Sequence, residues 1–153
     1  MVQQLVEIAA HALSPGINEP FTALTCIDWL GAALRGVAQR EIPSPLRQDE
    51  NGHLRVVTST LDFAVMARAA FDQIRLYGAE NPDVMLRLLQ IIAEIGPDLR
   101  REGDREVLMQ HARLIGADAA QIHNENDRLR VANCLEETLR ALAQSGTQQT
   151  MEQ

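Results

Sequence analysis

The side chains most able to bind a metal ion or move a proton occur as separate pairs in this sequence. Glu7 and His11 are one helical turn apart, and His111 precedes Asp118 by two turns, so each pair could share a proton or hold part of a metal site. A metal site requires at least a third ligand, such as His123, and neither pair has one nearby in the sequence. We therefore expect no metal ion, no cofactor and no catalytic residue.

Nucleophilic catalysis also lacks the spacing that it usually needs. Ser14 does not stand in a Gly-x-Ser-x-Gly motif, and Cys26 has no histidine near it in the sequence. Glu50 and His53 have the Glu-x-x-His spacing of di-iron helical bundles, but they flank a predicted turn instead of sharing a helix. The sequence thus gives no specific indication of an enzyme.

Most of the unusual local chemistry lies in the stretch from His11 to Asp28, which contains a helix end, a tight turn and a helix start. Pro15 lacks an amide hydrogen and disfavours a helical Ser14. Gly16 can take the left-handed conformation that is common where helices end. These residues predict the end of the first helix.

The second helix is expected to begin directly after this turn. The Asn18 side chain can accept hydrogen bonds from the first free amides of the helix, Glu19 suits the positive end of the helix dipole, and Pro20 is tolerated there. A capping role therefore explains the turn. Alternatively, the free amides form a polar pocket with Ser14 and Thr22 for a ligand or partner, although Glu19 occupies the place of an anion such as phosphate.

Composition favours helices and argues against several classes of function. Aromatic residues make up only 3% of the chain, so the core must consist of aliphatic side chains and methionine, which favours helices over a β-sandwich. A net charge of -7 with scattered arginines argues against nucleic-acid binding. Cys26 and Cys134 have apolar neighbours, as expected for core residues in the reducing cytoplasm. No stretch has the apolar length of a membrane span.

These features predict a mainly α fold, a single compact bundle of about six helices with one small β-hairpin between the second and third helices. Asn51-Gly52 is a strong hairpin signal, and the hairpin at about 46–57 should pack on the helices or pair with that of another subunit. Residues 1–144 are expected to form one domain and 145–153 a disordered tail. The expected helices cover about residues 2–13, 19–40, 58–77, 82–95, 104–122 and 128–144.

The second predicted helix carries features of an interface. Its small residues offer low relief, which suits close packing within the domain or between subunits. Trp29 is either an interface anchor or a partly buried core residue. Asp28 is either a solvated carboxylate or a buried anchor for an arginine. The small residues are Gly31, Ala32, Ala33 and Gly36.

A second polar cluster ends the third predicted helix. Asp72, Arg75 and Tyr77 precede Gly78, and an arginine at a helix C-terminus complements the helix dipole. Alternatively, Arg75 and Tyr77 turn toward the Asn18 turn and Asp28 to form a buried polar network. That network would be the first place to look for a site.

Two motifs in the chain resemble the bacterial predicted membrane proteins of domain-of-unknown-function family 2254. They are the run from Ala12 to Pro20, followed by Thr22-Ala23 and Asp28, and the run from Phe71 to Gly78. The resemblance covers about residues 4–142. It implies the soluble part of a protein whose membrane-embedded segment lies N-terminal, and it implies no mechanism. Glu19 departs from the aspartate more usual in the family.

Two functional hypotheses follow. The first is a non-catalytic interaction or regulatory module, a cytoplasmic domain that forms a homo-oligomer beneath the membrane-embedded segment of the parent protein. The second is a sensor or enzyme that binds an unidentified small molecule in a polar pocket. It predicts that the candidate residues converge on one cavity, with Asp28 or Arg75 buried. The candidate ligand or partner residues are Ser14, Gly16, Asn18, Glu19, Thr22, Asp28, Asp72, Arg75 and Tyr77.

Overall fold

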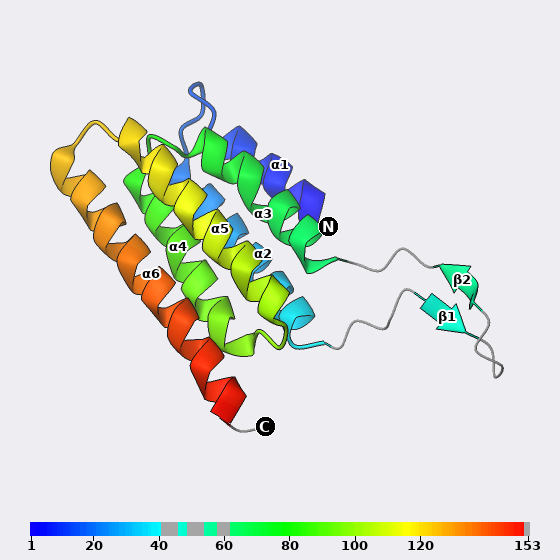
Figure 1. Cartoon of the computed structure of the whole chain (residues 1–153). Coiled ribbons are helices and arrows are strands. Elements are labelled where there is room, and N and C mark those ends of the chain that lie inside the picture. The colour runs from blue at the N-terminus through cyan, green and yellow to red at the C-terminus, as the bar shows by residue number, and fades with distance from the viewer. Residues whose placement is uncertain (41–45, 49–53, 58–61, 152–153) are drawn as a thin grey trace.

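A computed structural model describes residues 1–40, 46–48, 54–57 and 62–151, and the side chains of residues 1–40 and 62–145. The α-helices among these residues form two layers of three, confirming a mainly α fold (Figure 1). Consecutive helices are antiparallel, so the chain builds three stacked helical pairs. One layer contains α1 (Val2–Ala12), α3 (Phe63–Tyr77) and α5 (Glu102–Asp118), and the other contains α2 (Pro20–Ala38), α4 (Pro82–Ile95) and α6 (Glu125–Met151).

Helix α4 lies at the centre of the second layer. It packs between α2 and α6 in its own layer and against α3 and α5 across the core. Its apolar residues recur on more than one face, as the sequence pattern predicted, so the helix can be buried on several sides. The residues buried on α4 are Val84, Met85, Leu88, Leu89, Ile91, Ile92 and Ile95.

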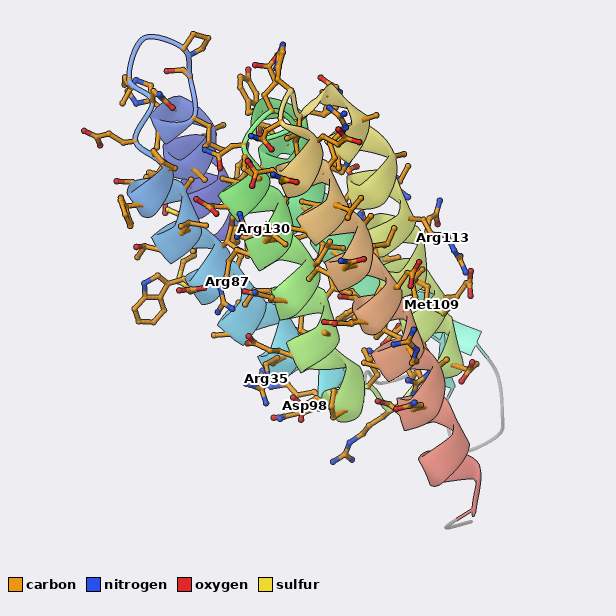
Figure 2. The ribbon with its side chains drawn as sticks, turned by 90° about the vertical axis from the view of Figure 1, so that its left-hand side faces the viewer. Arg35, Arg87, Asp98, Met109, Arg113 and Arg130 are labelled. Atoms are coloured by element: carbon orange, nitrogen blue, oxygen red, sulfur yellow. The ribbon has the colours of Figure 1, made fainter. Side chains whose placement is uncertain are left out.

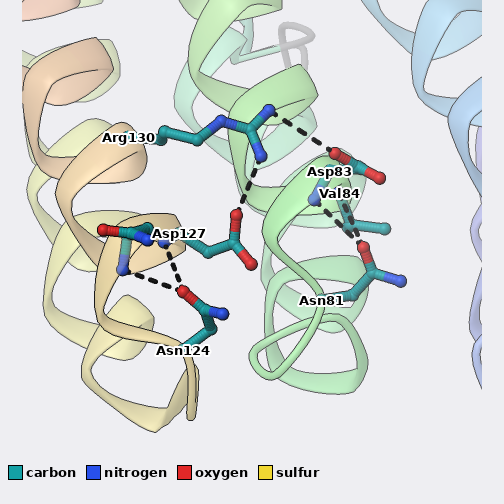
Figure 3. Close-up of polar contacts among 7 residues, drawn as sticks. Asn81, Asp83, Val84, Asn124, Asp127 and Arg130 are labelled. Carbon is teal, nitrogen blue, oxygen red and sulfur yellow. Dashed lines mark hydrogen bonds and ion pairs between the residues drawn. The ribbon is translucent and has the colours of Figure 1, made fainter.

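Asparagine caps begin α4 and the neighbouring α6. The Asn81 side chain accepts hydrogen bonds from the amides of Asp83 and Val84, and Asn124 caps α6 in the same way (Figure 3). Arg130 of α6 lies 3.9 Å from the Asp83 carboxylate of α4. The two helices therefore start side by side, with an exposed ion pair between them.

Close approach of α2 to α4 depends on Gly31. A Cβ atom at this position would lie 2.7 Å from two carbon atoms of the Ile91 side chain, whereas one at Gly36 would meet nothing within 4 Å. The predicted low-relief surface thus serves packing within the domain at Gly31. Gly36 leaves open space beside the same helix.

Strands β1 (Leu46–Gln48) and β2 (Leu54–Val57) pair antiparallel, with Leu46 opposite Val57. The hairpin prediction rests on Asn51-Gly52, which lies outside the described residues. Figure 1 shows the strands apart from the helices, in contrast to the expectation that they pack on the bundle.

Helix α6 continues to Met151, through the segment from residue 145 that the sequence suggested would be disordered. The stretch contains no proline, and its single glycine, Gly146, costs a helix only about 1 kcal/mol relative to alanine. A polar composition therefore did not prevent the helix from continuing. Short 3-10 turns, Gly96–Asp98 and Ala119–Gln121, connect α4 to α5 and α5 to α6.

We expect Gly31→Ala to destabilise the domain by about 1–3 kcal/mol, because the added methyl group forces the Ile91 side chain from its place. Gly36→Ala is the matched control in the same helix. It should leave stability unchanged or raise it by up to about 1 kcal/mol through helix propensity. Urea unfolding followed by circular dichroism measures both. Equal stability of the two variants would contradict the packing described.

Candidate functional site

The turn between α1 and α2 differs from its predicted geometry. Asn18 has a φ of 49°, so it and not Gly16 takes the left-handed conformation, which asparagine tolerates better than most residues. Asn18 also does not cap α2, whose N-cap residue is Glu19, with no side-chain cap hydrogen bond. Pro20 is the first residue of α2, within the first turn where the sequence placed it.

Backbone hydrogen bonds close this turn on itself. The amides of Ile17 and Asn18 both donate to the Ser14 carbonyl at 3.0 Å, and the Glu19 amide donates to Ala12 at 2.8 Å. The Ser14 hydroxyl donates to the His11 carbonyl. The Ser14 hydroxyl and the Glu19 amide, which were predicted to face a ligand, therefore already donate hydrogen bonds within the turn.

Two cavities adjoin the turn and divide the candidate residues between them. Glu19 and Thr22 line a largely apolar groove of about 870 Å³ between α1 and the start of α2, here called the α1–α2 groove. Asn18 and Tyr77 line a second cavity of about 620 Å³, where the α1–α2 and α3–α4 turns meet. Leu13, Pro15, Asn81 and Gln121 also line this second cavity.

Asp28 has an arginine partner, but the partner is Arg87 on α4. Its Oδ1 accepts a hydrogen bond from Arg87 Nε at 2.6 Å, and the Asp28 side chain is 53% exposed. Arg87, which is labelled in Figure 2, also contacts Glu94 at 2.9 Å. Of the two alternatives for Asp28, the structure therefore shows a solvated carboxylate, and its arginine partner forms a surface ion pair between two helices of one layer.

Arg75 is partly buried, with 12% of its side chain exposed, and takes part in a polar cluster between α3 and α5. It forms an ion pair with Asp118, and it lies 3.9 Å from Asp72. The alternative in which Arg75 and Tyr77 both turn toward the Asn18 turn and Asp28 is therefore wrong for Arg75, because Asp118 of α5 supplies its main carboxylate. Tyr77 does share a cavity with Asn18.

His111 joins this cluster from α5. Its Nδ1 atom lies 3.6 Å from Asp72 Oδ1, too far for a hydrogen bond, and its ring packs edge-on against Phe71. Burial lowers the pKa of His111, the Asp72 carboxylate opposes that change, and nearby arginines, Arg75 and Arg68, reinforce it. The folded domain thus favours a neutral imidazole.

The candidate residues accordingly do not share one cavity. Glu19 and Thr22 lie at the groove, and Asn18 and Tyr77 lie at the second cavity. Asp28 and Arg75 form separate polar contacts with other helices. Sequence reasoning missed Arg87 as the partner of Asp28, and nothing in local spacing connects residues 59 positions apart. Within the part of the chain that the structure describes, no three His, Cys, Asp or Glu side chains gather as a metal site would require.

Fold and site together define a helical domain with two cavities beside its first turn and ion pairs that join its helices. A family model of predicted membrane proteins, DUF2254, matches residues 1–94, and the chain belongs to this family. The resemblance seen in the sequence is thereby confirmed. Among the helices of the described residues, none combines the length and apolar character that crossing a membrane requires.

Mycobacterial proteins are similar to this chain along almost all of it. The uncharacterized proteins Mb1321c of Mycobacterium bovis and Rv1290c of Mycobacterium tuberculosis are each 30% identical over 147 residues, or 95% of the chain. The chain spans 28% of the length of these relatives. No solved structure matches it.

His111 makes stability depend on pH. Because its pKa in the folded state lies below the ordinary 6.5, the unfolded chain binds a proton more readily. The contribution to stability is fully present above about pH 6.5 and is lost as pH falls from there toward the folded-state pKa. Where the unfolded chain carries one more proton than the folded chain, each pH unit changes the free energy of unfolding by about 1.4 kcal/mol.

We expect His111→Gln to flatten the fall in unfolding free energy between pH 7 and pH 5, measured by urea unfolding. His11→Gln, at an exposed position outside this cluster, provides the matched control. An unchanged slope in His111→Gln would show that burial does not hold this imidazole neutral.

Proposed function

We propose that this domain is a non-catalytic interaction module that self-associates through the outward face of α2. The observation that carries the proposal is the exposure of two large aromatic side chains on this face, Phe21 at 83% and Trp29 at 65%. Aromatic anchors are enriched at the centres of protein interfaces. The chain has few aromatic residues, and it places these two where they contribute little to the core.

The outward face is a continuous stripe along the helix. Phe21, Thr25, Trp29 and Ala32 follow one another at helical spacing and are all exposed. Asp28 adjoins Trp29, and its ion pair with Arg87 offsets the charge that would otherwise repel a second copy. Such a stripe can pack against itself about a two-fold axis, with the low relief of Ala32 giving room for an aromatic ring.

The proposal extends to the setting of the domain. The family description supports a membrane-embedded segment in the parent protein, beneath which the domain would assemble and regulate. Cys26 and Cys134 are free, which suits the reducing cytoplasm. The antiparallel strands add edges that could pair with the same strands of another subunit.

One observation favours a second candidate function, the binding of a small molecule. The cavity that contains Asn18 and Tyr77 has a volume of about 620 Å³, within the range of small-molecule pockets. Polar groups of Asn81 and Gln121 also line it. Here the ligand would contact the turns and would not reach Arg75 or Asp28.

Substitution of the aromatic stripe tests the first candidate. We expect Trp29→Ser to weaken dimerisation by about 2 kcal/mol or more, or roughly 30-fold in dissociation constant, because a hot-spot side chain is removed. Sedimentation velocity over a range of concentrations measures this change. Leu129→Ser removes a 60% exposed apolar side chain from α6 and serves as the matched control. A wild-type domain that sediments as a monomer at every concentration would contradict the proposal.

A further inference from the structure

The α1–α2 groove lies on the outer side of the first helical pair. Ile8 is half exposed and lies two residues from both Val6 and Ala10, which are buried, so it points away from the core. Leu5 and Ile17 add apolar surface to the groove. Figure 2 shows α1 and α2 as the outermost pair of the stack, so no further pair of the described helices covers this side.

The shape of this surface suits another helix. A surface helix of a globular domain normally turns its polar residues to the side away from the core. Here the outer face retains Ile8 and Ile17 in a groove of about 870 Å³. The groove is therefore an uncovered face of the kind that a packed helix fills.

The charge of the groove selects the partner. Glu7 and Glu19 contribute carboxylates, and His11, Gln4 and Thr22 supply the other polar side chains. Neither Lys nor Arg is among the lining residues of the groove. An apolar floor with carboxylates beside it is complementary to an amphipathic helix that carries lysines and arginines along its polar side.

We propose that the α1–α2 groove binds a basic amphipathic helix from the membrane-flanking part of the longer parent protein. The family consists of predicted membrane proteins, and this chain spans 28% of its relatives. Segments next to membrane helices on the cytoplasmic side are enriched in Lys and Arg. Docking of such a segment would fix the domain against the membrane and leave the α2 stripe free for self-association.

A model peptide tests this binding with the whole chain. The probe is an 18-residue amphipathic helix with leucine on one face and lysine on the other, and its twin carries glutamate in place of lysine. Binding is followed by isothermal titration calorimetry. We expect the lysine peptide to bind at least tenfold more tightly than the glutamate peptide, and Ile8→Ser to weaken the lysine peptide about fivefold.

Two double variants distinguish binding in the groove from a general attraction of the lysine peptide to an acidic protein. Glu7→Gln combined with Glu19→Gln should weaken the lysine peptide by roughly three- to tenfold at low salt. Glu136→Gln combined with Glu137→Gln makes the same change of net charge on α6 and should leave binding unchanged. Equal losses in both double variants, or equal binding of the two peptides, would overturn the proposal.

The single variants Trp29→Ser and Ile8→Ser distinguish peptide binding in the groove from self-association of the domain. Trp29→Ser should weaken assembly without affecting the peptide, and Ile8→Ser should weaken peptide binding without affecting assembly. Loss of both properties in either variant would show that the groove is not a separate binding surface.

Discussion

The arrangement of this domain depends on burying α4 along most of its length. Its aliphatic side chains are inaccessible to solvent both toward its neighbours in the same layer and toward the other layer. Neighbouring helices must therefore surround it. With so few aromatic residues in the chain, this aliphatic contact supplies much of the apolar burial that offsets the entropy of folding. Gly31 lets α2 approach closely enough to complete that burial.

Because the helices pack around α4, the charged side chains must lie where the apolar core leaves room for them. Arg87 reaches Asp28 across the outer surface of one layer, and Arg75 reaches Asp118 between two helices of the other. Both contacts join neighbouring helices and so contribute to the way the helices stack. Two apolar features stand apart from these contacts, the exposed aromatic side chains of α2 and the groove beside α1.

Local sequence was a good guide to the elements and a poor guide to their polar contacts. Breaks at Pro15, Gly78 and Pro97 and the apolar period of α4 predicted the helices, because these signals act over a few residues. The partner of Asp28 was not predictable, because it is 59 residues away and depends on how the helices stack. The role of Asn18 was also not predictable from local sequence. An asparagine can either cap a helix or take a left-handed conformation, and the neighbouring residues do not decide between the two.

The most direct measurement is native mass spectrometry of the purified wild-type chain, because one spectrum reports subunit number and any retained small molecule. An assembly module predicts a homo-oligomer whose mass is a whole multiple of the 17.0 kDa chain, with no bound ligand. A monomer carrying a stoichiometric additional mass would contradict that account. It would direct attention to the cavity that contains Asn18 and Tyr77.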